Sequence, residues 1–296
     1  MTELVPDGPG GVPLEDVPCD LCGADDTAPL LRSGDLRRGV PGGFEVVGCR
    51  GCGLAFVNPR PTPAGIARYY PEDYAPHRPG PPNPLESLYY RAFRRPPVPP
   101  GSRVLDVGCG GGRYLLHLRR LGYEVQGVEP SADTAATLRR DFDLAVHPGQ
   151  LVDAALPDAH FDAVTLWWVL EHTHSPSAVL AEAHRILKPG GRIVVALQNW
   201  DSLARRCFGP HWHHLDLPGH LYQLTPRSLR ALLEAAEFHV DRLRQDPLAK
   251  DFAPSLGHRL GLPLDRPLPN LLALPFDLLA WACGRSGLMT AYATRR

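Results

Sequence analysis

The segment VLDVGCGGG, residues 104–112, constrains the fold of this chain more than any other feature of its sequence. A short apolar run passes through the acidic residue Asp106 into a loop that contains four glycines, at 108 and 110–112. Glycine adopts positive φ without strain and lets a bound molecule approach the backbone closely. A strand that leads through such a loop into a helix is typical of an open α/β sheet, whose ligands bind at the carboxyl ends of the strands.

Alternating strand and helix patterns follow this loop. They predict strands at 103–107, 124–128, 143–147, 161–166 and 191–197, helices at about 112–121, 132–141, 176–187 and 226–237, and a last pair of strands at 238–245 and 287–294. Strands that alternate with helices predict a parallel sheet with helices on both faces. The expected fold class is therefore α/β, with a doubly wound, seven-stranded, mostly parallel sheet.

Changes of composition divide the 296 residues into four parts. A polar, Pro- and Gly-rich stretch comes first, then two CxxC pairs in short β-like runs, then a Pro-rich connection, which proline makes stiff. We expect a disordered tail at 1–18, a CxxC module at 19–75, a connection at 76–101 with one helix at 85–95, and the α/β domain at 102–296 with insertions at 199–225 and 247–285.

The glycine loop differs from a dinucleotide site. In such a site the loop reads GxGxxG and the helix N-terminus holds a pyrophosphate. Here Asp106 stands two residues before the first glycine, and a carboxylate there suits a cation. A purely structural strand–turn–helix is the alternative. With the strand pattern that follows, the segment resembles the class I S-adenosylmethionine-dependent methyltransferase superfamily, whose loop cradles the methionine and ribose of the cofactor.

The resemblance implies where S-adenosylmethionine binds. Glu129 ends the second strand and is expected to accept hydrogen bonds from the ribose hydroxyls, the alternative being a helix cap. Gln150 stands where similar enzymes often carry an acid for the adenine amino group. Segments 161–172 and 187–195 resemble the fourth and fifth strands of the family. The implied cofactor-binding residues are Asp106, Gly108, Cys109, Gly110, Gly112, Glu129, Pro130, Gln150, Leu151 and Trp167.

Glu171 and His172 follow the fourth strand, beside the expected position of the sulfonium. Many O-methyltransferases and deoxysugar C-methyltransferases have Glu-His at this place, and the ordinary pKa of histidine suits a proton acceptor near neutral pH. His172 is therefore a candidate general base, or else it caps a helix or lines the cofactor pocket. Some members bind a metal through an acid three residues before the Glu. Trp168 occupies that place here, so no catalytic metal is expected.

The insertion at 199–225 carries a dense polar and aromatic segment, HWHHLDLPGHLY at 211–222. Three interpretations remain open: a metal site, an acceptor pocket in which His220 is a second candidate base, or a packed loop. A Trp followed by Asp-x-Pro-x-His-Leu resembles methyltransferases of polysaccharide and natural-product gene clusters, and this favours the acceptor pocket. The catalytic candidates are thus His172, His220 and Glu171.

The two CxxC pairs are each followed by glycine, at Gly23 and Gly53. Tetrahedral zinc takes four thiolates, and each CxxC turn supplies two of them. A module of this size gains much of its folding energy from the metal, so a structural zinc ribbon at 19–75 is predicted. Four reduced cysteines without a metal are the alternative. The predicted ligands are Cys19, Cys22, Cys49 and Cys52.

Composition narrows the function. The net charge of −1, with 31 basic and 32 acidic residues, gives no global field for nucleic acid. Without a secretory signal or a spanning apolar run, a cytoplasmic location is expected. The leading function is O-methylation of a sugar, glycan or natural-product hydroxyl. The alternatives are C-methylation of a nucleotide-linked keto sugar, whose similar enzymes carry an additional C-terminal domain, RNA methylation through the zinc ribbon, and cofactor binding without turnover.

The expected partner is a small-molecule or glycan acceptor. The insertion at 247–285 contains an apolar run, PNLLALPFDLLAWACG. It is interpreted as packing on the sheet, as a homodimer contact or as a peripheral membrane contact.

Overall fold

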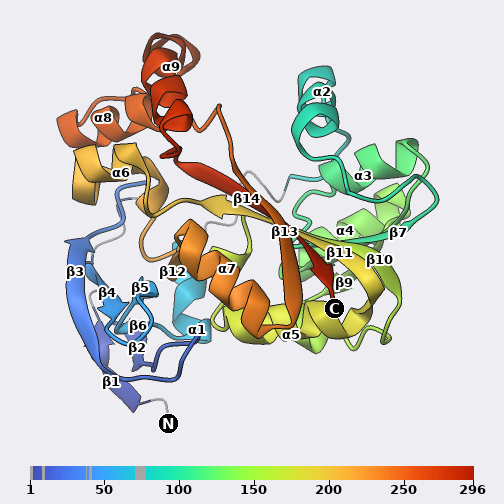
Figure 1. The fold of residues 1–296 in the computed structure, drawn as a ribbon, viewed down its shortest axis with the longest axis horizontal. Coiled ribbons are helices and arrows are strands. Elements are labelled where there is room, and N and C mark those ends of the chain that lie inside the picture. Colours follow the sequence, from blue (N-terminus) through green and yellow to red (C-terminus); the bar gives the residue numbers. More distant parts are fainter. Residues whose placement is uncertain (1–2, 9–10, 38, 40–41, 71–77) are drawn as a thin grey trace.

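The structure is a computed structural model that describes residues 3–8, 11–37, 39, 42–70 and 78–296. Its largest element is a seven-stranded sheet in the order β13-β14-β11-β10-β7-β8-β9 (Figure 1). All neighbours pair in parallel except β14, which runs antiparallel to both β11 and β13. This confirms the predicted fold class. The strands are β7 (Arg103–Val107), β8 (Glu124–Glu129), β9 (Ala145–Pro148), β10 (Phe161–Trp167), β11 (Leu187–Gln198), β13 (Phe238–Gln245) and β14 (Leu288–Arg295).

Both faces of this sheet are covered, which explains why its central strands are almost continuously apolar. In β10, Val164 and Leu166 pack into one core while Ala163 and Trp167 pack into another. Side chains of α5 and α7 join the first core, and side chains of α3 join the second. The helices are α2 (Pro84–Phe93), α3 (Arg113–Arg120), α4 (Ala132–Phe142), α5 (Pro176–Ile186) and α7 (Pro226–Ala235), with short 3₁₀ turns η3 (Leu151–Asp153) and η4 (Leu170–His172).

The N-terminal part forms two small sheets. One has the order β1-β2-β6, and the other has the order β12-β5-β4-β3. Their strands are β1 (Glu3–Gly8), β2 (Val12–Asp16), β3 (Thr27–Ser33), β4 (Phe44–Cys49), β5 (Ala55–Val57), β6 (Arg60–Pro61) and β12 (Tyr222–Gln223), and α1 (Pro63–Ile66) and η1 (Ala67–Tyr69) follow β6.

The expectation of a disordered tail at 1–18 is corrected, because β1 and β2 lie within it. Val12 and Leu14 alternate toward the core and are buried, so β2 has an apolar face despite its Pro- and Gly-rich surroundings. Strand β1 pairs antiparallel with β2. The expected boundary between residues 75 and 76 lies outside the described residues.

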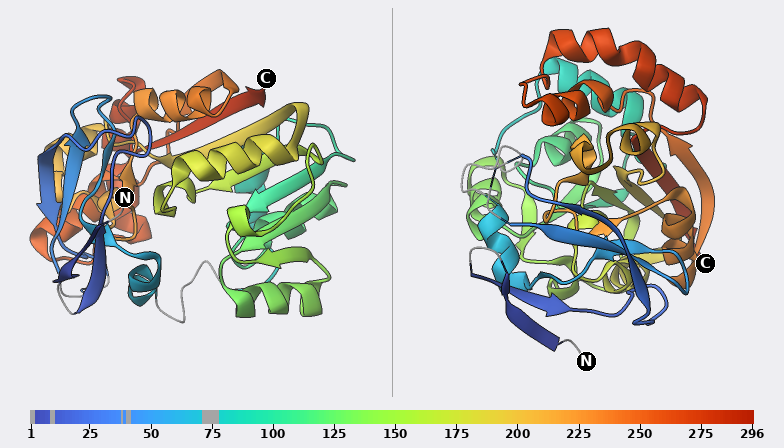
Figure 2. Two further views of the ribbon diagram at one scale, coloured as in Figure 1. Left: turned by 90° about the horizontal axis from the view of Figure 1, so that it is seen from below. Right: turned by 90° about the vertical axis from the view of Figure 1, so that its left-hand side faces the viewer.

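The insertion at 199–225 joins the N-terminal part to the large sheet. Its strand β12 pairs with β5, with Tyr222 opposite Phe56. Figure 2 shows the N-terminal strands, in blue, to one side of the green and yellow strands of the large sheet. Its Trp212 packs in one core with Phe44 and Tyr69 of the N-terminal part. The insertion also contains α6 (Leu203–Phe208) and the 3₁₀ turns η5 (Gly209–His211) and η6 (His213–Leu215). The CxxC module therefore shares both a sheet and a core with the α/β domain.

The insertion at 247–285 forms α8 (Phe252–Leu260) and α9 (Pro267–Ala282). The buried residues of α9 are Asp277 and Ala280, whereas most of its large apolar side chains are exposed. Packing on the sheet thus buries few of the apolar side chains of this helix. The dimer and membrane interpretations remain predictions. Within the described residues, no helix combines the length and hydropathy needed to cross a bilayer.

Candidate active site

The glycine loop after β7 is built as the sequence predicts. Gly108, Gly110 and Gly112 have φ values of 64°, 51° and 72°, which other residues rarely adopt. A Cβ on Gly111 would collide with the carbonyl oxygen of Arg78, so the chain crosses directly over the loop there. The backbone N–H of Gly80 donates to the Gly111 oxygen over 3.2 Å. The loop is therefore closed on one side by the segment that precedes α2.

Asp106 lies buried beside this loop. The hydroxyl of Thr165, its partner residue on β10, donates to Asp106 Oδ1 over 2.7 Å. Burial raises the pKa of Asp106 to about 7, against the opposing effects of this hydrogen bond and of Arg94. A buried carboxyl group with one donor is suited to receive a cation, because a positive charge would compensate the lost solvation.

Glu129 ties two parts of the same edge together. Its carboxylate accepts hydrogen bonds from the backbone N–H groups of Gly110, over 2.8 Å, and Ser131, over 2.9 Å. Pro130 lies between Glu129 and the start of α4. The backbone N–H of Gly149 donates to the Glu129 carbonyl oxygen over 3.0 Å. The ends of β7, β8 and β9 are thereby held together around the loop.

The remaining predicted cofactor residues also lie near these strand ends. Gln150 is exposed and precedes η3, in which Leu151 is buried. Cys109 is buried so close to β8 that a Cβ on Gly127 would lie 2.7 Å from its sulfur. Trp167 ends β10. The structure thus gathers the predicted set at the carboxyl edge of the sheet, where ligands bind in this class of fold.

Arg94, which no sequence pattern indicated, lies near enough to Asp106 to lower the pKa of its carboxyl group. Its guanidinium carbon lies 4.3 Å from the ring centroid of Trp168 and 5.0 Å from that of Trp167. The rings of Tyr89 and Tyr90 approach it to 5.3 and 5.4 Å. Four aromatic rings therefore surround one cation. The sequence does contain the aromatic pairs Tyr89-Tyr90 and Trp167-Trp168, but nothing in their spacing indicates that they surround Arg94.

His172 lies at the junction of three segments. Its Nδ1 is 2.9 Å from the hydroxyl of Tyr70, in the N-terminal part, and 2.8 Å from the carbonyl oxygen of Gly219, in the insertion. The ring centroids of His172 and His220 are 4.6 Å apart. The two residues predicted as alternative bases thus belong to one cluster.

Glu171 and His220 complete this cluster. His220 Nδ1 lies 2.9 Å from the carbonyl oxygen of His214, and burial lowers the pKa of His220 to about 3. Glu171 is 0% exposed, and burial raises its pKa to about 8. Neither of its carboxylate oxygens has a hydrogen-bond partner in the described part of the chain. One ligand atom from each of Glu171, His172 and His220 lies within 4.8 Å of the other two.

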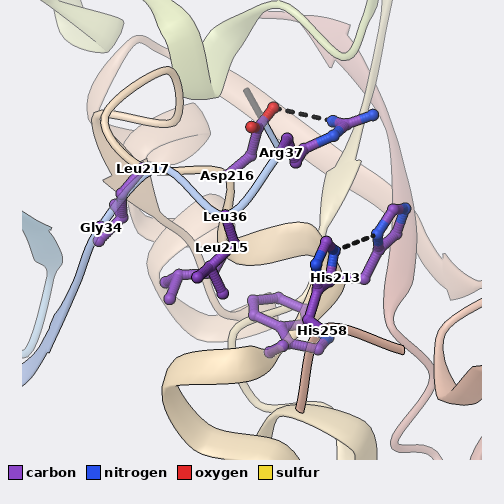
Figure 3. A pocket seen from close by; sticks show the side chains of 9 residues that line it. Gly34, Leu36, Arg37, His213, Leu215, Asp216, Leu217 and His258 are labelled. Atoms are coloured by element: carbon purple, nitrogen blue, oxygen red, sulfur yellow. Dashed lines mark hydrogen bonds and ion pairs between the residues drawn. The ribbon is translucent and has the colours of Figure 1, made fainter. Parts of the chain in front are cut away.

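The rest of the 211–222 segment is engaged in packing. Trp212 Nε1 donates to Asp251 over 2.6 Å, and Arg37 pairs with Asp216 over 2.9 Å. His213 lies 3.2 Å from His258 (Figure 3). The cavity among these side chains has a volume of about 10 Å³, which is room for one water molecule. This part of the segment is therefore a packed loop. Only its His220 is among the three residues Glu171, His172 and His220, which are called the active-site cluster below.

The four predicted zinc ligands meet in the N-terminal part. The sulfur of Cys19 lies 3.4 Å from that of Cys52, the sulfur of Cys22 lies 3.5 Å from that of Cys49, and all four atoms lie within 4.8 Å of one another. A tetrahedron with metal–sulfur bonds of about 2.3 Å has edges of about 3.8 Å. Burial raises the pKa of Cys49, but hydrogen bonds, chiefly from the backbone N–H of Cys52 and the thiol of Cys22, together outweigh it and lower the pKa to about 7.

The first CxxC pair contacts the segment that follows His172. Asp20, which lies between two of the cysteines, accepts hydrogen bonds from the Ser175 hydroxyl and the Ser177 N–H, both over 2.8 Å, at the start of α5. Arg60 donates to the His174 carbonyl oxygen over 2.7 Å. The cysteine cluster is therefore connected to the active-site cluster through short polar contacts.

Known proteins resemble this chain over the α/β domain. Residues 82–243 match the sequence profile of a family described as a methyltransferase domain. A ubiquinone biosynthesis O-methyltransferase of Rhodopseudomonas palustris is 33% identical over 49% of this chain and 58% of its own length. One from Xanthomonas oryzae pv. oryzae is 32% identical over 48% of this chain and 64% of its own length. The chain thus spans between 58% and 64% of these two relatives.

Solved structures share the fold. Geranyl diphosphate C-methyltransferase from Streptomyces coelicolor A3(2) is 19% identical, with a TM-score of 0.53 over 80% of this chain and 100% of that chain. A SAM-dependent methyltransferase from Archaeoglobus fulgidus is 21% identical, with a TM-score of 0.51 over 71% of this chain and 93% of that chain. At these identities the likeness is one of fold.

Proposed function

Because this chain belongs to the methyltransferase domain family, we propose that it transfers the methyl group of S-adenosylmethionine to a hydroxyl of a sugar, glycan or natural product. The observation that carries this proposal is the placement of a histidine pair, His172 and His220, beyond the end of β10, whose Thr165 bonds the cation-binding candidate Asp106. The name O-methyltransferase of the two relatives supports a hydroxyl acceptor.

The residues around the glycine loop have the chemical groups needed to bind S-adenosylmethionine. Asp106 would bind the methionine ammonium, and Glu129, which Gly110 and Ser131 hold in place, would bind the ribose hydroxyls. The side-chain carbonyl oxygen of Gln150 would accept a hydrogen bond from the adenine amino group, beside Leu151. Arg94 brings donors for the methionine carboxylate. The sulfonium of the bound cofactor supplies an electrophilic methyl group.

The active-site cluster would hold the acceptor hydroxyl and take up its proton. His172 is the leading base, because Tyr70 and Gly219 fix the orientation of its ring. His220 and Glu171 are the other two candidates. Positioning the hydroxyl in line with the methyl–sulfur bond contributes much of the expected rate, and a general base adds about 10²–10⁴-fold.

The four cysteines would hold a structural zinc ion. All four tetrahedral positions are filled by thiolates, so the ion would supply folding energy to the module rather than chemistry.

Cofactor affinity should depend on the ionisation of Asp106, whose pKa is about 7. Below that pH the carboxyl group is protonated and neutral, so it no longer attracts the ammonium, which stays charged up to about pH 7.7. The dissociation constant for S-adenosylmethionine should therefore rise about tenfold for each pH unit below 7. Calorimetric titrations between about pH 5.5 and 7.5 would measure this. The Asp106→Asn variant should bind S-adenosylmethionine weakly at every pH. If its dissociation constant still changes with pH, the pH dependence belongs to another group.

The acceptor class is tested with S-adenosylmethionine labelled in its methyl group. The purified protein is incubated with host extract divided into nucleotide-sugar and glycan, lipid, small-metabolite and RNA fractions. Label in the glycan or small-metabolite fraction would support the proposal, and the position of the label on oxygen or carbon would separate O- from C-methylation. Label in RNA would overturn it. No transfer to any fraction, with cofactor binding intact, would favour a binding protein without turnover.

A further inference from the structure

Glu171 carries a buried carboxylate close to the two histidines, His172 and His220. It is 0% exposed, and both of its oxygens are without a hydrogen bond among the residues that the structure describes. Its backbone is fixed, since the Leu221 N–H donates to the Glu171 carbonyl oxygen over 2.8 Å. Burying an unpaired carboxylate is costly unless a cation or donors compensate it. The surrounding side chains therefore indicate what the carboxylate is held to bind.

The imidazoles of His172 and His220 each place one nitrogen within 4.8 Å of a Glu171 carboxylate oxygen, and each ring is also held by a backbone carbonyl. His220 Nδ1 lies 2.9 Å from the His214 carbonyl oxygen, and His172 Nδ1 lies 2.8 Å from the Gly219 carbonyl oxygen. When Nδ1–H donates to a carbonyl, the lone pair resides on Nε2. This outer contact is the one that histidine ligands of metals usually make.

We propose that Glu171, His172 and His220 bind a first-row divalent transition-metal cation. One ligand atom from each lies within 4.8 Å of the other two, a spacing that a small movement of the side chains closes around an ion. Two imidazoles and one carboxylate suit such a cation and leave further coordination positions open. The third ligand comes from the insertion at 199–225, so the presence of Trp168 three residues before Glu171 does not preclude a metal.

The role of the cation rests on the proposed hydroxyl methylation, whereas the site itself does not. An acceptor with two neighbouring oxygens, such as a diol or a hydroxyketone, would occupy two open positions. Its bound hydroxyl becomes more acidic and releases its proton to water. The oxygen then forms a bond to the methyl carbon while the carbon–sulfur bond breaks, and that electron pair leaves on sulfur. His172 would then be a ligand and not the base.

Cobalt(II) binding tests the site independently of turnover. The full chain, with its cysteine cluster filled by Zn²⁺, is titrated with Co²⁺ while the visible spectrum and the heat of binding are recorded. We expect one Co²⁺ per chain with weak bands and without the intense thiolate charge-transfer bands of a cysteine site. Glu171→Gln, which keeps the shape of the side chain, and His220→Asn should each weaken Co²⁺ binding by at least about 100-fold, more than loss of an outer contact usually costs.

The matched control is His239→Asn, because His239 is an exposed histidine of β13. It should bind Co²⁺ like the unchanged protein. Circular dichroism and S-adenosylmethionine affinity verify that each variant is folded. Absence of Co²⁺ uptake, or equal uptake in both ligand variants, would overturn the site. If the protein takes up no Co²⁺ but still transfers methyl groups in the presence of a chelator, the metal site is wrong and the proposed function stands. If the protein takes up Co²⁺ but transfers methyl groups to no fraction, the metal site stands and the proposed function is wrong.

Discussion

Replacing Cys19 and Cys49 together by serine should lower the rate of methyl transfer by at least about 100-fold, the loss that a displacement of about 1 Å can cause. Zinc would supply much of the folding energy of the module, so the double variant should lose the module's structure. Tyr70 would then no longer hold His172, and Asp20 would no longer hold the start of α5. The rate with labelled S-adenosylmethionine and the zinc content by elemental analysis measure the two effects.

Cofactor affinity separates this effect from general unfolding. Asp106 and Glu129 belong to the large sheet, so the dissociation constant for S-adenosylmethionine should change by less than about threefold, within about 0.7 kcal/mol. Cys283→Ser is the matched control, since Cys283 is an exposed thiol outside the cluster. A double variant that loses its zinc and keeps its full rate would show that the module does not support the active site.

Substituting His172 by Gln should lower kcat by about 10²–10⁴-fold while leaving the affinity for S-adenosylmethionine nearly unchanged. The imidazole is lost as a base or as a metal ligand in this variant, whereas the glycine loop and Asp106 keep their places. Single-turnover rates and calorimetric cofactor titrations provide the two measurements.

His220→Gln is the companion variant, because both rings belong to one cluster. An unchanged rate in His172→Gln together with a large loss in His220→Gln would assign the proton transfer to His220. Unchanged rates in both would place the chemistry elsewhere. His239→Gln, on the surface of β13, should keep the full rate.

The α/β domain was predictable from sequence because its signals are local. Periodicity and turn residues mark each strand and helix, and the predicted strands agree with the structure to within a few residues. The third predicted strand, 143–147, is shifted in the structure to Ala145–Pro148. Asp143 has a left-handed backbone with φ 50° and ends α4, so the strand starts after it.

The assembly of the active-site cluster was not predictable, because it depends on contacts between distant segments. Glu171, His172 and His220 were named as candidates, but their convergence depends on the course of the insertion. Tyr70 reaches His172 from the N-terminal part, and no pattern around it suggests a partner. The Leu221 N–H donates to the Glu171 carbonyl oxygen, so the backbone beside the buried carboxylate is likewise held by the distant insertion.

The pairing of β12 with β5 has a consequence for biosynthesis. A ribosome releases the chain from its N-terminus, so β5 emerges long before Tyr222 and Gln223, its partners at the sheet edge. Until then the nascent module exposes an unpaired strand edge, which is prone to pairing with other chains. Chaperone protection should matter most in this interval, and a separately expressed N-terminal fragment should aggregate unless β12 is supplied with it.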